Sequence, residues 1–386
     1  MKKKKKEKKI LYQLIFSAFL LFSNAYLVKA NSDILSQDST GKYCINTEQD
    51  YYNFIENIQN YNNKTVILCN DIDISDVPEA TSSFGGILNG KGHTITYASK
   101  EAKENIAVFP FRINDNGIVE NINVQIDESY AYNSETDEFQ TVFSQCDGIA
   151  KGITIKGNVT CIYDDEDENV SIGAIEGNGT LMDSSIAITY DLQSEKTIEE
   201  IAEDIVENDL EFEFCQLGTT YTGITYQNCI GYGQYSEAIK SLADELEPKI
   251  EDDTWGYLCV SFTRKSFSST SASATNCYYD KENMPDIKIR SEYIANRDNN
   301  KEFPNYADFG KTTSEMKNQG TYEGFDFNKK WTISPEDNNG YPYYNLQTEE
   351  ITLKVQASTE PKVWSTSVPR DYNRFVDYAK NYHFPY

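Results

Sequence analysis

Apolar and polar residues alternate in short runs along most of the chain from about residue 66 onward, and glycine, asparagine and aspartate separate the runs. An alternation of period two puts every second side chain on one face and is typical of β-strands. The pattern therefore predicts a mainly β fold. The predicted inward positions are Val66, Leu68, Ile72 and Ile74; His93, Ile95 and Tyr97; Ile122, Val124 and Ile126; Ile153, Ile155, Val159, Cys161 and Tyr163; Ile186, Ile188 and Tyr190; Phe212 and Phe214; and Ile224 and Tyr226.

A longer unit repeats over these strands. It consists of an apolar strand, a polar turn with glycine, and an isoleucine-rich strand that ends in Asn, Ser or Cys. Units of roughly twenty residues that each bury one edge must stack to form a core, which is the logic of a solenoid. Strands of this length and spacing predict a parallel β-helix. The unit occurs at 105–124, 138–159, 169–190 and 211–230, with a last copy at 257–279.

Three segments have helical periodicity instead. Residues 47–58 begin with a candidate capping box, Thr47 and Asp50, and we expect this helix to cover the open end of the stack. Covering matters because an exposed end is a sheet edge that invites aggregation. Residues 196–208 and 236–246 are expected to be helical insertions on the flank of the stack. The apolar faces of the three helices are Tyr51, Phe54, Ile55 and Ile58; Ile198, Ile201, Ala202 and Ile205; and Ile239, Leu242 and Leu246.

The first thirty residues predict export. Seven lysines among the first nine residues precede an apolar run from Ile10 to Val28, and Ala30 follows closely. This order of a charged region, an apolar region and a small-residue exit marks a secretory signal peptide. A membrane anchor is the alternative, since the run approaches the roughly 18 residues that a spanning helix needs. We expect an extracellular protein, secreted or surface-associated, with a signal peptide at 1–30, a β-helix domain at 31–347 and a tail at 348–386 that could cap the last coil.

The charge of the chain excludes some partners. The net charge is −26, and removal of residues 1–30 leaves 27 basic and 60 acidic residues, a net charge of −33. Such a surface repels phosphate backbones and anionic membranes. We therefore expect no nucleic-acid partner and no membrane insertion after signal cleavage. Solubility is the simplest role for the acidity.

All eight cysteines follow residue 30. An even number in an exported chain permits disulfides. Cys44 precedes the first helix and Cys69 lies in the strand after it. If these strands are neighbours in register, the two Cα atoms fall within the roughly 4.4 to 6.8 Å that a disulfide requires. The competing interpretation is two buried thiols. Without a C-x-x-C motif, and with His93 and His383 as the two histidines, no spacing resembles a zinc site.

Two stretches resemble bacterial GLUG-type repeat proteins. The opening YCINTEQDYYNFIENI, KTVILCNDIDI and FGGILNGKGHTITY is similar to the start of such arrays, and NCYYD with KTTSEMKNQGTYEGFDFNKKWTISPEDNNGYPYYNLQ is similar to their end. The two bracket 43–347. The resemblance implies a right-handed parallel β-helix, as in surface adhesins and the N-terminal region of immunoglobulin A-cleaving metallopeptidases. In the matched motif, Phe84, Ile87 and Leu88 are expected to pack inward, while the glycines allow a tight turn.

No catalytic residue, cofactor site or metal site is assigned. HExxH and GxSxG are absent from the sequence. Asp71 and Asp73 are expected to point outward, and His93 to have an inward structural role. The acidic tract 164–168 lacks the alternation of a calcium loop and predicts a solvated turn. The aromatic tail after Gln347 predicts either a short helix around 375–382 or an aromatic binding surface.

Two functions remain open. The first is a secreted or surface-associated, non-enzymatic β-helical protein of a bacterium that acts in adhesion or in glycan or protein binding, with host or cell-surface glycans or proteins as partners. The second is a carbohydrate-active β-helical enzyme, a polysaccharide lyase or glycoside hydrolase, with a cleft bordered by the two helical insertions. The second rests on analogy of fold alone.

Overall fold

The computed structural model describes most of the chain between residues 35 and 367. The predicted signal peptide, the acidic tract 164–168 and the predicted helix around 375–382 lie outside the described residues, as does most of the serine-rich segment 266–274. The described ranges are 35–75, 77–78, 80, 82–98, 107–131, 140–163, 169–218, 223–263, 272–298, 303, 305–345, 350–356 and 361–367.

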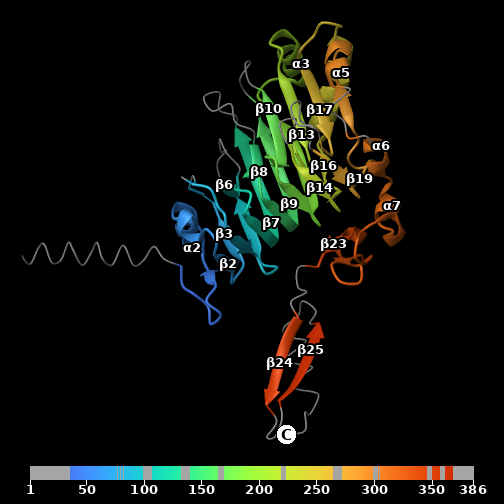
Figure 1. The fold of residues 1–386 in the computed structure, drawn as a ribbon. Helices are drawn as coiled ribbons and strands as arrows, with labels where there is room; N and C mark the ends of the chain where they lie inside the picture. The colour runs from blue at the N-terminus through green and yellow to red at the C-terminus, as the bar shows by residue number, and fades with distance from the viewer. Residues whose placement is uncertain are drawn as a thin grey trace, which may run out of the picture.

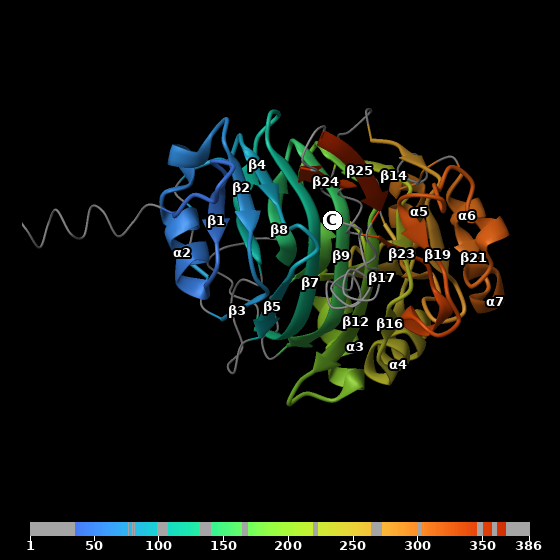
Figure 2. The same ribbon diagram turned by 90° about the horizontal axis from the view of Figure 1, so that it is seen from below.

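The fold is mainly β and is dominated by a large sheet whose strands pair in parallel (Figures 1 and 2). Nine strands form its continuous path: β1 (Tyr43–Ile45), β2 (Thr65–Leu68), β4 (Ile87–Asn89), β7 (Ile118–Ala131), β9 (Ile149–Ile162), β12 (Ser185–Gln193), β15 (Ile230–Gly231), β19 (Tyr278–Asp280) and β21 (Gly310–Lys311). Six more pair beside this path: β3 (Ile72–Ile74), β5 (Thr94–Ala98), β11 (Thr180–Met182), β14 (Thr225–Gln227), β16 (Gln234–Tyr235) and β18 (Ala274–Thr275).

A second sheet of six strands alternates with the first along the chain. Five of its strands are parallel, and β20 closes the sheet by pairing antiparallel with β17. Its strands are β6 (Phe109–Ile113), β8 (Gln140–Cys146), β10 (Val170–Ile175), β13 (Glu211–Cys215), β17 (Tyr257–Ser261) and β20 (Ile287–Ile289). From β6 to β19 the chain therefore places a strand in one sheet, then in the other, and returns one layer further along.

The register shows how this layering repeats. Ile87 pairs with Ile118, and Ile118 pairs with Ile149, so the early layers are equally spaced along the sequence. Later layers contain more of the chain, because Ser185 pairs with Ile230 across a longer stretch of sequence. Each predicted unit of about twenty residues contains a strand of the six-stranded sheet followed by one or more strands of the large sheet. The units are shorter than the layers, so the sequence pattern does not give the layer length.

The core lies between the two sheets. Ile95 pairs with Val124, and Val124 with Ile155, so branched side chains stack from layer to layer. These side chains are almost fully buried, and they fit the pleated surface well. The inward positions predicted from the alternation are buried with one exception. His93 is half-buried at the surface, with its Nδ1 3.1 Å from the exposed carboxylate of Asp71, so the inward role expected for His93 is wrong.

Helices form where the apolar spacing is helical. α2 (Glu48–Glu56) and η1 (Ile58–Tyr61) lie at one end of the stack, and α6 (Tyr306–Phe309) and α7 (Thr313–Met316) lie at the other (Figure 2). α3 (Ile198–Glu207) and α4 (Glu237–Leu246) occur between strands and contact each other. Thr47 Oγ1 accepts from the backbone N–H of Asp50, but Asp50 accepts from Asn46 rather than from Thr47, so the expected capping box is only half formed.

The C-terminal part adds a small second core on the outside of the large sheet. Residues from α7 to β23 (Tyr343–Tyr344), including η3 (Gln319–Thr321), β22 (Trp331–Thr332) and η4 (Asn338–Gly340), cover β15 and β19. This core consists of Ile230, Tyr278, Met316, Tyr322, Phe325, Trp331 and Tyr341. Beyond it, β24 (Glu350–Gln356) and β25 (Pro361–Ser367) form an antiparallel hairpin within the segment that the sequence analysis treats as a tail.

A disulfide joins Cys44 to Cys69, with the two Cα atoms 5.8 Å apart. β1 and β2 are parallel neighbours, and Ile45 pairs with Leu68, so the strands have the adjacency on which the prediction depended. The other six cysteines are buried thiols. The bridge attaches the segment before α2 to the first long strand after it.

We expect the Cys44→Ser/Cys69→Ser variant to lose about 3 kcal/mol of unfolding free energy, because the bridge closes a 25-residue loop in the unfolded chain. Urea unfolding with and without reductant measures the loss. Reductant should lower the midpoint of the wild type and leave that of the variant unchanged. A Cys44 peptide that alkylates freely in the non-reduced protein would contradict the bridge.

Candidate functional site

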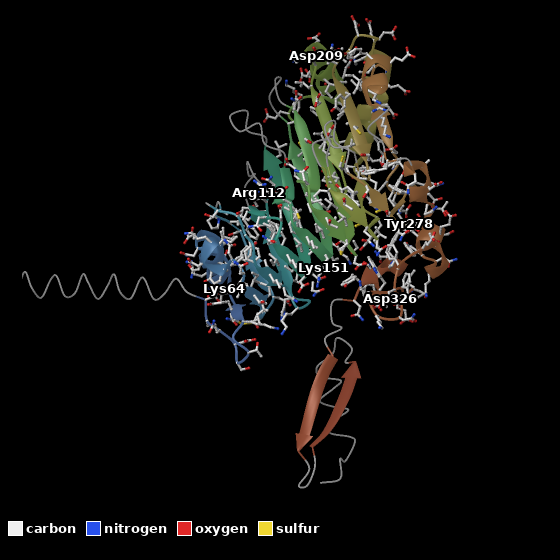
Figure 3. The ribbon with its side chains drawn as sticks, viewed as in Figure 1. Lys64, Arg112, Lys151, Asp209, Tyr278 and Asp326 are labelled. Carbon is white, nitrogen blue, oxygen red and sulfur yellow. A yellow bond between two sulfur atoms is a disulfide. The ribbon has the colours of Figure 1, made fainter. Side chains whose placement is uncertain are left out.

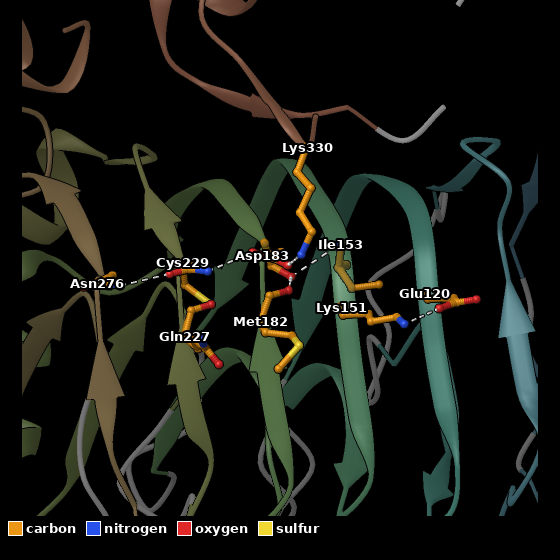
Figure 4. Close-up of polar contacts among 11 residues, drawn as sticks. Glu120, Lys151, Ile153, Met182, Asp183, Gln227, Cys229, Asn276 and Lys330 are labelled. Atoms are coloured by element: carbon orange, nitrogen blue, oxygen red, sulfur yellow. Dashed lines mark hydrogen bonds and ion pairs between the residues drawn. The ribbon is translucent and has the colours of Figure 1, made fainter. Parts of the chain in front are cut away.

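A row of polar side chains runs along one turn of the large sheet (Figure 4). Asn121, Gly152, Asp183, Asn228 and Asn276 occupy equivalent places in successive layers, and each has a positive φ between 49° and 60°. Asparagine, aspartate and glycine tolerate this left-handed conformation better than other residues do. The turn thus explains why these residue types recur at the end of the predicted strands.

Hydrogen bonds connect the last three of these turns. Asn276 Nδ2 donates to Asn228 Oδ1 at 3.2 Å, and Asn228 Nδ2 donates to Asp183 Oδ1 at 3.0 Å (Figure 4). Lys330 Nζ, from the C-terminal segment, lies 2.8 Å from Asp183 Oδ2. This hydrogen bond raises the pKa of Lys330. Asp183 is nearly buried, so its charge needs these partners. This row of hydrogen-bonded side chains attaches the C-terminal segment to the large sheet.

We expect Asp183→Ala to cost about 2 kcal/mol, because it leaves the Asn228 amide and the Lys330 ammonium without an acceptor, although Lys330 is half exposed. Asp183→Asn retains an oxygen for Asn228 and should cost about half as much. Urea denaturation of both variants, and of Asp183→Ala/Lys330→Met, gives the comparison. If Asp183→Ala and Asp183→Asn lost the same unfolding free energy, the loss of the charge alone would account for the effect.

A second polar cluster surrounds a buried carboxylate, Asp280. Tyr341 OH donates to Asp280 Oδ2 at 2.5 Å, Thr313 Oγ1 donates at 2.7 Å, and Asn283 Nδ2 donates at 3.0 Å. Burial raises the pKa of Tyr341, which therefore stays protonated as a donor. Thr313 and Tyr341 belong to the C-terminal segment, so their hydrogen bonds join it to β19, whereas Asn283 follows β19 directly. The cluster is organised for attachment rather than for a reaction on a bound molecule.

A polar cleft of about 250 Å³ opens beside β20. One wall of the cleft follows α4, where η2 (Glu247–Lys249) leads into the loop before β17. The start of α5 (Glu292–Asp298) completes the cleft. It is lined by Glu247, Ile250, Glu251, Asp252, Lys288, Ile289, Arg290, Ser291 and Glu292. The cleft begins at the C-terminal end of α4, one of the two helical insertions that were expected to border a cleft. α3 and α4 pack on each other there, and Lys249 Nζ lies 3.4 Å from Glu203 Oε1.

Two partly exposed aromatic side chains belong to residues that follow the cleft lining in the chain. Trp255 is 46% exposed and Tyr293 is 49% exposed, and they are the exposed large hydrophobic residues of the described chain. Their ring centroids are 4.8 Å apart, with an angle of 53° between the planes. Each follows residues that line the cleft: Trp255 comes shortly after Asp252, and Tyr293 directly after Glu292. Exposed aromatic groups beside a polar cavity are a common feature of binding surfaces.

Hydrogen bonds fix the backbone below the aromatic pair. Ser291 Oγ donates to the carbonyl of Thr254 at 2.6 Å and accepts from the N–H of Ile294 at 3.3 Å. The N–H of Trp255 donates to Asp209 Oδ1 at 3.3 Å, and Asp209 lies at the upper end of the molecule in Figure 3. Ser291 and Thr254 are buried. The loop that carries Trp255 is therefore attached both to α5 and to the loop after α3.

The sequence pattern does not reveal this pair. The aromatic surface predicted from sequence lies in the tail after Gln347, whose side chains lie outside the described residues. The available signal was Trp255, which follows the acidic run Glu251, Asp252 and Asp253 after one intervening residue. Its partner Tyr293 could not be found from sequence, because β20 and its antiparallel turn bring the two together.

Neither a metal cluster nor a spanning helix is found in the part of the chain that the structure describes. No group of three or more His, Cys, Asp or Glu side chains is arranged there to hold a metal ion. None of the helices in the same ranges is long and apolar enough to cross a membrane. Comparison with family models, curated proteins and solved structures gave no match to this chain.

Proposed function

We propose that this protein is a secreted or surface-associated, non-enzymatic binding protein of a bacterium, with the architecture of a right-handed parallel β-helix. The alternation of strands between two parallel sheets, in layers that repeat regularly along the sequence, supports the β-helix. The lysine-rich, apolar N-terminal sequence supports export. The resemblance to GLUG-type repeat proteins supports an adhesin-like role.

The observation that carries the binding function is the exposed pair of Trp255 and Tyr293 beside the polar cleft. Two large rings that are about half exposed, one on a loop and one on α5, favour contact with a partner because burial removes their apolar surface from water. Rigid aromatic groups lose little side-chain entropy when a partner binds, so they provide contact area efficiently. We place adhesion, through contact with a host or cell-surface glycan or protein, at this surface.

The test compares the wild type with Trp255→Ala/Tyr293→Ala on a glycan array and on immobilised extracellular-matrix proteins. Tyr343→Ala, on the C-terminal segment, serves as the matched aromatic control, and circular dichroism checks that each variant folds. We expect binding that the double variant loses by tenfold or more, since exposed aromatic anchors dominate such interfaces. Equal binding by all three proteins would place the contact elsewhere.

The same incubations test whether the protein is a carbohydrate-active enzyme instead of a binding protein. Reducing ends or unsaturated products released from a panel of polysaccharides would favour a carbohydrate-active enzyme over a binding protein. A bound glycan recovered intact would favour the binding function.

A further inference from the structure

We propose that Cys229 and Cys277 form a second disulfide when the chain folds in contact with an oxidant. Both are buried thiols in the structure, and they directly follow Asn228 and Asn276, whose amides are hydrogen-bonded to each other (Figure 4). The inference goes beyond the proposed binding function and uses only the proposed export, because an exported chain folds where thiols are oxidised.

The backbone places the two cysteines side by side in adjacent layers of the large sheet. Before them, Gln227 pairs with Thr275. After them, Ile230 pairs with Tyr278, and the N–H of Tyr278 donates to the carbonyl of Cys229 at 2.9 Å. Neighbouring strands lie roughly 4.7 to 4.9 Å apart, which falls within the roughly 4.4 to 6.8 Å between the Cα atoms of a disulfide.

The side chains of the two cysteines also have the same orientation. Cys229 Sγ donates to the carbonyl of Gln227 at 3.5 Å. Cys277 Sγ donates to the carbonyl of Thr275, likewise at 3.5 Å. Each thiol is therefore turned toward the residue two positions before it. Because these two acceptor residues are paired in register, the two sulfur atoms lie one above the other along the stack.

Contact between the two thiols affects when the bond forms. Burial raises the pKa of Cys229 well above its usual range, and a hydrogen bond with Cys277 raises it further. The thiolate is the attacking species in disulfide exchange, so this pair reacts slowly once the chain is folded. We therefore expect the bond to form during folding. Cys69, in contrast, is only half-buried, so the Cys44–Cys69 bond does not depend on oxidation during folding.

The oxidant is a small-molecule disulfide such as oxidised glutathione. The thiolate of one cysteine attacks the S–S bond of the oxidant, which gives a mixed disulfide and releases one glutathione thiol. The other cysteine attacks the mixed disulfide, forms the Cys229–Cys277 bond and releases the second glutathione thiol. The protein loses two protons and two electrons, and the oxidant gains them.

The preceding layer shows that serine fits at this position. Ser185 pairs with Ile230, so Ser184 occupies the place below Cys229. Ser184 Oγ donates to the carbonyl of Met182 at 2.7 Å, which is the same bond to the residue two positions before. Cys229→Ser/Cys277→Ser is therefore expected to fold and is the variant that removes the bond.

The test refolds the reduced wild-type chain in a mixture of reduced and oxidised glutathione. Remaining thiols are alkylated with iodoacetamide in denaturant, and the digest is analysed by mass spectrometry without reduction. We expect a cross-linked pair of peptides that contains Cys229 and Cys277 and that separates when reductant is added. The peptide of Cys146, another buried thiol, is the internal control and should be alkylated.

Two results would overturn the inference. One is alkylation of Cys229 and Cys277 in a refolded sample in which Cys44 and Cys69 are bridged. The other is a set of cross-links that joins Cys229 to several different cysteines, since that would show random oxidation.

Unfolding provides a second measurement. While Cys229 and Cys277 are thiols, as in the structure, reductant leaves the urea midpoint of Cys44→Ser/Cys69→Ser unchanged. After oxidative refolding of this variant, reductant should lower the midpoint, because the second bond restricts the unfolded chain across a loop of 48 residues, the separation of Asn228 and Asn276. Adding the two serine substitutions at 229 and 277 should remove this response. A response that persists would overturn the inference, since another pair of cysteines would then cause it.

Discussion

Replacing Gly157 with alanine is expected to destabilise the protein by about 4 kcal/mol, because the change combines a strained dihedral with displacement of two paired strands. Gly157 lies in β9, opposite Ile126 of β7, and has a φ of 138° that other residues rarely adopt. A Cβ atom there would overlap the Ile126 carbonyl oxygen, which is backbone and cannot move aside alone. Urea unfolding monitored by far-ultraviolet circular dichroism measures the loss.

Gly41→Ala is the control that separates strain from steric clash. Gly41 also has a positive φ, 82°, but a Cβ atom there would have no atom within 4 Å. We expect a loss of about 1 kcal/mol from the left-handed conformation alone. If Gly157→Ala cost no more than Gly41→Ala, the close approach of β7 and β9 at this position would be contradicted.

The sequence predicted the strands well, because alternation reports burial directly. Ile95, Val124 and Ile155 were each assigned to an inward face, and the register stacks them in neighbouring layers. His93 was assigned inward from the same parity and is half-buried at the surface. The parity argument fails there because His93 precedes β5, and the backbone of the preceding turn does not continue the pleat.

The length of each layer and the row of turn residues with positive φ were harder to predict. The layers from β4 to β9 are longer than the unit of about twenty residues that the sequence pattern predicts. The left-handed turn at Asn121, Asp183 and Asn228 could not be predicted, because these residue types tolerate such a turn but do not require it. Their stacking depends on the register of strands far apart in sequence.

The candidate site was not predictable because it joins separate elements. Trp255 is in the loop before β17 and Tyr293 is on α5, which follows the antiparallel strand β20. Sequence alone predicted neither β20 nor its reversal of direction. The helical insertions, in contrast, were found from their apolar spacing, and the structure shows that they pack on each other.

Phe54→Ala is expected to cost about 4 kcal/mol, the cost of removing a large side chain from a closed core. Phe54 is fully buried on α2, and its ring lies 5.5 Å from that of Tyr61, 5.4 Å from Phe84 and 5.7 Å from Phe111. These partners belong to η1, to the segment before β4 and to β6. Through these ring contacts, Phe54 packs α2 against residues in or next to both sheets, in the first layers of the stack.

The loss should also be local. In stacked layers each strand contacts mainly its neighbours, so an end that loses its cover frays first while distant layers keep their structure. Hydrogen exchange should therefore accelerate in β2 and β4 of Phe54→Ala and change little in β12. Phe54→Leu, which retains most of the buried volume, is the control and should lose about 1 kcal/mol. Uniform acceleration through β12 would mean that the stack unfolds as one cooperative unit, and that α2 stabilises all of it rather than its first layers.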